Sequence, residues 1–260
     1  MKIGIFDSGI GGLTVLHQAM ITLREEDYLY YADTDHVPYG IRQKEEILEF
    51  VDDALRFMLE KGIKAVIIAC NTATSAAIQT LRSRYTIPIL GMEPAVKPAV
   101  AREEEGKRVM VAATPLTLRE EKLRNLLHQV DKHHTVDLLP LPELVRFAER
   151  EEFTSPAVEE YLTQKLAPYR AEEYSALVLG CTHFNYFKDT FARLFPSSTE
   201  LIDGSVGTVN HLQDILQAGN LLEHGSGCVE YYRSGRKADS PADLARYRRL
   251  HLRLEEMLRF

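Results

Sequence analysis

Short aliphatic runs alternate with longer amphipathic stretches in the first part of the chain. Residues 43–61 place apolar side chains three or four positions apart, which is the spacing of an amphipathic helix. The aliphatic runs predict buried strands at 2–6, 28–32, 65–69 and 88–90. Further helices are predicted at 13–25 and 74–85. This alternation is typical of an α/β protein with a parallel sheet.

The same alternation restarts after residue 107. Strands are predicted at 108–112, 135–139, 176–179 and 200–202. Helices are predicted at 118–130, 155–169, 186–194, 209–218 and 241–259. The runs before Cys70 and Cys181 are near-copies, each with four aliphatic positions, a small residue and then the cysteine. The sequence therefore predicts two similar parallel-sheet α/β halves, related by a pseudo-twofold axis.

The repeat also predicts where the chain divides. The proline-containing segment at 93–98 is the expected link between the halves. Residues after about Asp203 have no counterpart in the repeat, so we expect them to return and pack on the first half. The predicted domains are therefore 1–95 plus 208–260, which contains Cys70, and 96–207, which contains Cys181.

Composition and charge narrow the class of protein. The chain has 260 residues, of which 45% are hydrophobic and 27% charged, typical of an ordinary globular protein. A net charge of −7 argues against nucleic acid or an anionic membrane as the main partner. No apolar stretch reaches the roughly 18 residues that a membrane span requires. The start of the chain does not resemble a signal peptide, so we expect a cytoplasmic protein.

Three cysteines without a Cys-x-x-Cys pair favour reduced thiols over a structural disulfide. We expect Cys228 to be a small buried residue without a chemical role. Cys70 and Cys181 follow predicted strands, at the edge of a parallel sheet where ligands bind. Each also opens a predicted helix, which is expected to lower the pKa of a thiol.

A glycine-rich segment, DSGIGG at 7–12, lies between a predicted strand and a predicted helix. Its glycines allow backbone amides to approach a ligand, and a helix start favours an anion. The segment lacks the lysine of a phosphate-binding P-loop, so a carboxylate is at least as plausible a guest as a phosphate. The alternative is that Asp7 or Ser8 caps the helix.

Several kinds of chemistry use two cysteines and a histidine. Zinc requires further ligands at recognisable spacing, and none stands near Cys70 or Cys181. A thiol protease leaves the second cysteine unexplained, whereas a redox pair remains an alternative. Two thiols on opposite faces of one carbon explain the duplication, because one removes a proton while the other donates one. That reaction inverts a stereocentre.

Four motifs resemble the glutamate racemases of the cofactor-independent aspartate/glutamate racemase superfamily. They are FDSGIGGLTVL at 6–16, YYADTDHVPYG at 30–40, ACNTA at 69–73 and LGCTHF at 179–184. The resemblance implies an active site in the cleft between the halves. It also implies that L- and D-glutamate are interconverted without metal or pyridoxal phosphate, supplying D-glutamate for peptidoglycan. Members of the family usually form homodimers.

The resemblance also implies roles for individual residues. Cys70 and Cys181 correspond to the two catalytic acid/bases. Asp7 accompanies the first cysteine, whereas His183 and Glu149 accompany the second. The substrate-binding positions implied are Asp7, Ser8, Tyr39, Gly40, Asn71, Thr72, Thr182 and His183.

The chain departs from the family pattern at 113–120, which includes Thr117, and at Arg146 and Phe147. Three alternatives to glutamate racemisation stay open: racemisation of aspartate or another small acidic amino acid, amino-acid binding without turnover, and a thiol redox function.

Overall fold

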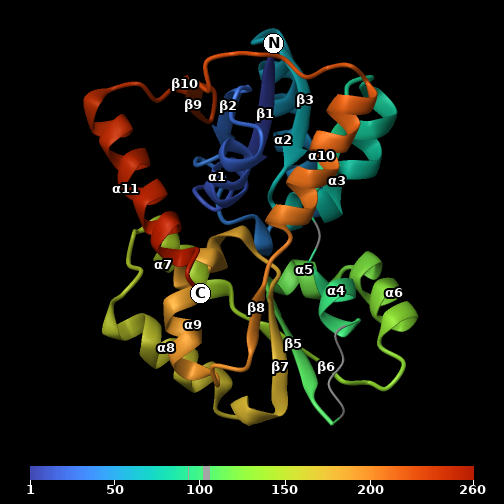
Figure 1. Ribbon diagram of the computed structural model, residues 1–260, viewed down its shortest axis with the longest axis vertical. Helices are drawn as coiled ribbons and strands as arrows, with labels where there is room; N and C mark the ends of the chain where they lie inside the picture. The colour runs from blue at the N-terminus through green and yellow to red at the C-terminus, as the bar shows by residue number, and fades with distance from the viewer. Residues whose placement is uncertain (93, 102–105) are drawn as a thin grey trace.

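The computed structural model describes residues 1–92, 94–101 and 106–260, and within these residues the strands form two sheets, one beyond the other along the molecule (Figure 1). The first sheet has the strand order β10-β9-β2-β1-β3-β4. Its strands are β1 (Lys2–Asp7), β2 (Asp27–Ala32), β3 (Ile63–Ile68), β4 (Ile89–Gly91), β9 (Val229–Arg233) and β10 (Arg236–Lys237). All neighbours are parallel except β9 and β10, which form an antiparallel hairpin.

The second sheet is parallel throughout and has the order β6-β5-β7-β8. Its strands are β5 (Arg108–Ala113), β6 (Val136–Pro140), β7 (Tyr174–Leu179) and β8 (Glu200–Ile202). This order repeats β2-β1-β3-β4 of the first sheet. The two central strands even share an irregularity, because the pairing register shifts after the first residue of both β1 and β5. The predicted α/β fold with two similar parallel-sheet halves is confirmed.

Helices cover the faces of both sheets (Figure 1). The α-helices are α1 (Leu13–Thr22), α2 (Lys44–Glu60), α3 (Asn71–Arg84), α4 (Val96–Val100), α5 (Pro115–Arg119), α6 (Glu121–Val130), α7 (Pro142–Glu149), α8 (Pro156–Leu166), α9 (Lys188–Leu194), α10 (Ser205–Ala218) and α11 (Pro241–Met257). Short 3-10 helices are η1 (Tyr39–Ile41), η2 (Ala171–Glu173) and η3 (Thr182–Phe187).

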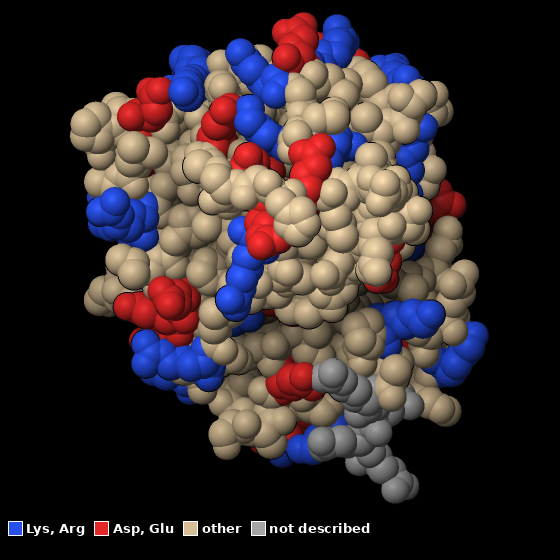
Figure 2. Space-filling view, turned by 45° about the horizontal axis from the view of Figure 1, so that its top comes forward, with Lys and Arg blue, Asp and Glu red and all other residues tan. Residues whose placement is uncertain are grey.

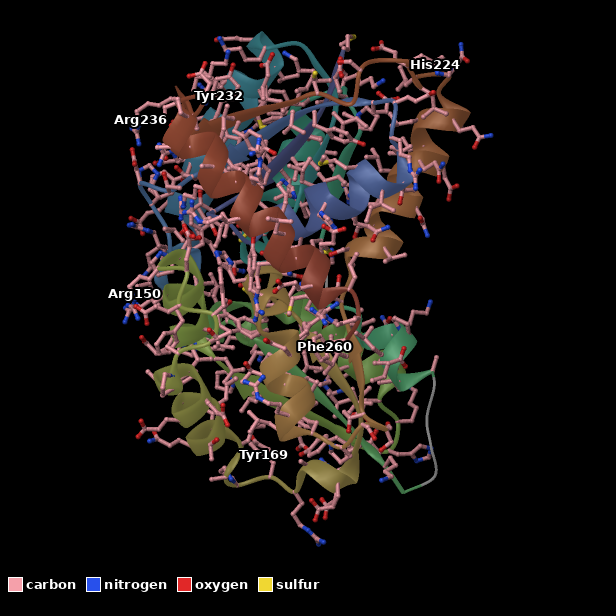
Figure 3. All side chains as sticks on the ribbon, turned by 60° about the vertical axis from the view of Figure 1, so that its left-hand side comes forward. Arg150, Tyr169, His224, Tyr232, Arg236 and Phe260 are labelled. Carbon is pink, nitrogen blue, oxygen red and sulfur yellow. The ribbon has the colours of Figure 1, made fainter. Side chains whose placement is uncertain are left out.

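The chain after β8 returns to the first half, as the repeat predicts. Strand β9 pairs with β2 over five residues, which adds the β9–β10 hairpin to the edge of the first sheet. Helix α11 begins after Ser240, whose side chain accepts a hydrogen bond from the amide of Asp243. The helix buries the stripe Tyr247, Leu250, Leu254 and Met257 and keeps charged residues outside. It runs from the hairpin towards the second half, where it ends near Phe260 (Figure 3).

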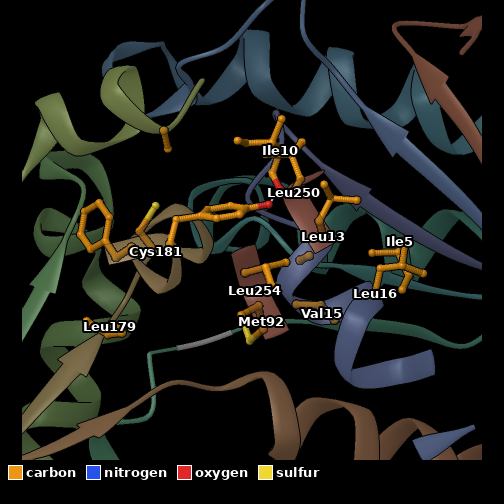
Figure 4. Close-up of a cluster of buried hydrophobic side chains, with 14 of the residues drawn as sticks. Ile5, Ile10, Leu13, Val15, Leu16, Met92, Leu179, Cys181, Leu250 and Leu254 are labelled. Carbon is orange, nitrogen blue, oxygen red and sulfur yellow. Dashed lines mark hydrogen bonds between the residues drawn. The ribbon is translucent and has the colours of Figure 1, made fainter. Parts of the chain in front are cut away.

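Hydrophobic packing is continuous between the halves. One cluster of buried side chains includes Ile5 and Leu16 from the first half together with Leu179 and Cys181 from the second (Figure 4). Burial of such apolar area contributes about 25 cal/mol per Å². The shared cluster therefore holds the two sheets in one arrangement around the space between them.

Some local predictions are wrong. The single helix predicted at 118–130 is divided into α5 and α6, because Glu120 adopts an extended conformation (φ −63°, ψ 136°). Helix α7 and strands β9 and β10 were not predicted. Cys228 is exposed rather than buried, since it lies in the outer segment that leads to β9. Of the link predicted at 93–98, Glu93 lies outside the described residues, and the later part forms the start of α4.

Charged side chains and helix lengths characterise the described surface. Among the described residues, no helix combines the length and apolar character that crossing a bilayer requires. Lysine, arginine, aspartate and glutamate side chains are interspersed over the face shown in Figure 2. No single-sign patch dominates that face.

Candidate active site

A pocket lies where the carboxyl ends of the two sheets meet. Cys70 enters it two residues after β3, and Cys181 enters it two residues after β7. These are equivalent strands of the repeat. The pocket is lined by Ser8, Pro38, Tyr39, Gly40, Ile41, Cys70, Asn71, Thr72, Thr114, Pro115, Pro142, Val145, Cys181 and His183. The repeated thiols therefore line one common pocket.

Cys70 is the N-cap residue of α3, and its Sγ accepts a hydrogen bond from the amide of Ala73 at 3.4 Å. Only 7% of the residue is exposed. Burial, with the nearby charge of Asp7, raises the pKa of Cys70 to about 12. The prediction that the helix start lowers this pKa is wrong, because loss of solvent outweighs the hydrogen bond and the helix terminus.

Asp7 ends β1 and is fully buried. Its carboxylate accepts hydrogen bonds from the amide of Gly9 and from Thr182 Oγ1, both at 3.0 Å. Burial raises the pKa of Asp7 despite these bonds and the neighbouring His183. The hydrogen bond from the Thr182 hydroxyl to Asp7 links the two halves of the chain.

Cys181 is the first member of a hydrogen-bonded chain. Its Sγ lies 3.8 Å from His183 Nδ1, and His183 Nε2 lies 2.7 Å from Glu149 Oε1. Burial alone would lower the pKa of His183, but the bonds to Cys181 and Glu149 raise this pKa well above its usual value. Both ring nitrogens of His183 therefore have a partner, Cys181 on one side and Glu149 on the other. The structure brings together the three residues that the resemblance places beside one another.

The glycine-rich loop binds a carboxylate that belongs to the protein itself. The amide of Ile10 donates to Glu149 Oε1 at 2.7 Å. A Cβ at Gly9 would lie only 1.8 Å from the same oxygen, so close approach requires glycine there. The alternative, a helix cap by Asp7 or Ser8, is wrong, because Gly12 is the N-cap of α1 and no side chain caps it.

The predicted polar residues Ser8, Gly40, Asn71 and Thr72 all line the pocket. Asn71 Oδ1 is buried and has no hydrogen-bond partner among the described residues. Thr72 Oγ1 lies 3.0 Å from Thr114 Oγ1 across the boundary between the halves. Asn71 is thus available to a ligand, whereas the Thr72 hydroxyl already has a partner.

Tyr39 also lines the pocket, but its hydroxyl is directed elsewhere. Its OH donates to Asp33 Oδ2 at 2.6 Å, and burial together with Asp33 raises the pKa of Tyr39. The residue therefore presents its ring and backbone to the pocket. Its phenol belongs to the supporting structure.

Sequence reasoning missed several lining residues. They are Pro38, Ile41, Thr114, Pro115, Pro142 and Val145. The repeat itself contains the signal for one of them, because Thr114 follows β5 as Ser8 follows β1.

Of the departures from the family pattern, the segment 113–120 reaches the pocket through Thr114 and Pro115, whereas Arg146 and Phe147 lie away from it. Arg146 pairs with Glu143 at 3.0 Å on the exposed side of α7, and Phe147 packs against the Tyr161 ring. Thr117 is behind the wall, with its hydroxyl bonded to Thr72 and Thr114.

Comparison with known proteins decides the family. The family model described as Asp/Glu/Hydantoin racemase matches residues 14–212. The chain belongs to this family. A glutamate racemase of Lachnospira eligens is 54% identical over 262 residues, covering 99% of both chains. Glutamate racemase 2 of Bacillus subtilis is 47% identical, covering 100% of this chain and 98% of the relative.

The solved structures of racemases agree with this assignment. Glutamate racemase from Francisella tularensis in complex with D-glutamate superposes with a TM-score of 0.79 at 28% identity, covering 98% of this chain and 93% of that one. The resemblance to glutamate racemases that the motifs predict is confirmed.

Proposed function

We propose that the chain is a glutamate racemase that uses Cys70 and Cys181 as its two acid/base groups. One observation carries the proposal: buried thiols from equivalent strands of two similar halves line one pocket. The family and the names of near-full-length relatives support glutamate as the substrate.

In the proposed reaction, one sulfur as thiolate removes the proton on Cα of glutamate. The other sulfur, as thiol, donates its proton to the opposite face of the same carbon. The C–H bond on one face is broken, a C–H bond on the other face is formed, and no electrons leave the substrate. The enantiomer formed presents its Cα proton to the second sulfur, so the reverse reaction uses the same two groups.

The two thiols have different surroundings. The pKa of about 12 keeps Cys70 protonated at neutral pH, as a proton donor must be. Cys181 Sγ lies 3.8 Å from His183 Nδ1, whereas Cys70 Sγ accepts a hydrogen bond from the amide of Ala73. We therefore propose that His183 assists proton transfer at Cys181 only.

The α-proton of an amino acid is far less acidic than a thiol, so the site must stabilise the developing negative charge. Preorganised donors in a site that excludes water contribute most to such stabilisation. No lysine or arginine is among the described residues that line the pocket, and the polar groups Ser8, Asn71 and Thr72 are neutral. We propose that these groups and the backbone at Gly40 bind the two carboxylates and the ammonium of the substrate.

Substitution of each cysteine tests the two-base assignment. Cys70→Ser and Cys181→Ser are each expected to abolish racemisation, measured by circular dichroism from either enantiomer. Exchange of the α-proton with solvent deuterium is expected to survive partly from one enantiomer in each variant. Racemisation at the wild-type rate by either variant would refute the assignment.

The alternatives are tested in parallel. Faster deuterium exchange on aspartate than on glutamate would identify an aspartate racemase. Binding of D-glutamate without turnover would identify a binding protein. The described cysteines are free thiols, and a disulfide between Cys70 and Cys181 in the untreated protein, detected by mass spectrometry, would favour a redox function.

We also propose the wider setting that the family resemblance implies: a cytoplasmic homodimer that provides D-glutamate for peptidoglycan. The proposed domains are 1–95 plus 208–260 and 96–207, and the pairing of β9 with β2 supports the return of the later segment to the first domain. Light scattering of the purified chain measures its oligomeric state.

A further inference from the structure

The carboxylate of Asp33, directly after β2, is the centre of a hydrogen-bonded group outside the pocket. It accepts bonds from Tyr39 OH at 2.6 Å and from Ser234 Oγ at 2.9 Å, and it lies 2.8 Å from His36 Nδ1. Asp33 is 3% exposed. Among the described residues, no lysine or arginine pairs with it. A buried carboxylate is tolerated only where hydrogen bonds compensate its desolvation, so these partners are tightly specified.

Each partner comes from a different segment. Tyr39 belongs to η1, whose residues line the pocket. His36 stacks on the ring of Phe50 from α2, with ring centroids 3.8 Å apart. Ser234 lies in the turn of the β9–β10 hairpin, which has no counterpart in the second half. Asp33 therefore joins the pocket wall to a late segment of the chain.

The hairpin is itself fixed against the loop that carries Asp33. The amide of Ser234 donates to Ala32 O at 2.9 Å, and Arg236 forms two hydrogen bonds with Asp35, at 2.6 and 2.8 Å. Figure 3 shows Tyr232 and Arg236 of the hairpin at the end of the molecule formed by the first sheet. At its other end the group reaches the catalytic machinery, because the amide of Asp33 donates to Asp7 O at 2.9 Å.

We propose that Asp33 is a positioning residue, which with Ser234 of the hairpin holds Tyr39 and the backbone at Gly40 in place beside Cys70. This inference rests on the proposed racemase function, since the wall that it fixes is the proposed substrate-binding wall. The Tyr39 hydroxyl acts through Asp33 and does not bind substrate. The β9–β10 hairpin is thus part of the site, although none of its residues lines the pocket.

The test combines three substitutions. Asp33→Asn keeps the size of the side chain but replaces an acceptor by a donor facing the Tyr39 hydroxyl. Tyr39→Phe removes only that hydroxyl. Ser234→Gly removes the Ser234 hydroxyl and suits the positive φ of 42° at this position. Asp239→Asn is the matched control, because it weakens the exposed ion pair with Lys237 of the same hairpin without contacting the loop that carries Asp33.

Displacement of a substrate-positioning group by 1 Å costs about 10²-fold. Asp33→Asn and Tyr39→Phe are therefore each expected to lower kcat/KM for glutamate by about 100-fold, mainly through a higher KM. Ser234→Gly loses the hydrogen bond from Ser234 Oγ to the Asp33 carboxylate and the bond that Oγ accepts from the amide of Asp35, and it is expected to lower kcat/KM about 10-fold. The control is expected to stay within twofold of wild type.

The double variant of Asp33→Asn and Tyr39→Phe separates the proposal from its rivals. If the hydroxyl acts through Asp33, the double variant is no worse than the poorer single variant. If the two substitutions instead multiply their effects on kcat/KM, the Tyr39 hydroxyl binds substrate on its own. That result would overturn the proposal. A lower melting temperature with unchanged kcat/KM in Asp33→Asn would also overturn it, because that is the result of a purely structural role.

Amide hydrogen exchange gives a readout that does not depend on turnover. Faster exchange is expected across residues 36–42 in Asp33→Asn and Ser234→Gly, where His36 and Arg42 donate backbone bonds to Asp33 and Tyr39. Unchanged exchange across residues 36–42 in both variants would refute the proposal that Asp33 and Ser234 hold η1 in place. A wild-type chain that does not racemise glutamate, combined with faster exchange in the variants, refutes the proposed function and leaves the anchoring of Tyr39 supported.

Discussion

Gly11 is the position where one added methyl group most directly disturbs the Cys181 side of the pocket. A Cβ at this position would lie 2.3 Å from Thr182 Oγ1 and 2.5 Å from His183 Nδ1, whereas ordinary contact begins at 3.4 Å. Gly11→Ala therefore forces the loop and these two side chains apart by roughly 1 Å, a misplacement that costs about 10²-fold in rate. This loss corresponds to about 2.7 kcal/mol of transition-state stabilisation.

The assay is circular dichroism of glutamate racemisation, with solvent deuterium exchange measured from each enantiomer. We expect kcat/KM to fall about 100-fold in Gly11→Ala. Exchange is expected to fall more from the enantiomer that is deprotonated by Cys181, because the displaced His183 is hydrogen-bonded to that sulfur. Overpacking is also expected to lower the free energy of unfolding by about 1–3 kcal/mol.

Gly207→Ala is the matched control. Gly207 lies in α10, and a Cβ there meets no heavy atom within 4 Å. Replacing glycine by alanine inside a helix is expected to stabilise the fold by up to about 1 kcal/mol without changing kcat/KM. Wild-type kcat/KM in Gly11→Ala, with the control behaving as expected, would refute the role assigned to the close contact between the loop and His183.

Other predictions concern the thiols and a buried ion pair. Iodoacetamide is expected to modify exposed Cys228 first, and modification of Cys70 should rise about tenfold per pH unit towards its pKa of about 12. Mass spectrometry measures both rates, and fast labelling of Cys70 at pH 7 would contradict its raised pKa. Lys64 and Glu26 form an ion pair of 2.6 Å with both side chains 2% exposed, so Lys64→Met alone should lower the free energy of unfolding by about 3–5 kcal/mol. Combination with Glu26→Leu should recover most of this loss in urea unfolding, and an unchanged midpoint in the single variant would contradict the buried pair.

Features that depend on local pattern are predictable from this sequence. The aliphatic runs before Cys70 and Cys181 identify both strands, and the repeat identifies the shared edge where the thiols lie. The motif around His183 correctly places it next to Cys181. The residues that make up each of these signals lie close together in the sequence. Periodicity and spacing are therefore enough to predict the strands and the neighbouring side chains.

Features that depend on distant contacts are not contained in such patterns. The pKa of Cys70 is raised because the fold removes solvent, although its helix position alone predicts a lower value. Thr182 has the chemistry of a substrate ligand, but the nearby Asp7 accepts its hydrogen bond. The amide of Ile10 in the glycine-rich loop donates to Glu149, which belongs to the second half of the chain. In each case a tertiary partner decides the role of a residue whose type is already suitable.

The pairing of β9 with β2 also bears on how the chain is made. Val229 begins β9 and Ala32 ends β2, so 229 − 32 = 197 positions separate the two edges that pair. At synthesis rates of about 5–20 residues per second, the edge of β2 waits roughly 10–40 s for its neighbour. The strands of the second sheet are all synthesised within this interval. During biosynthesis the first half therefore begins earliest and is completed last, with an unpaired edge open to other chains in the meantime.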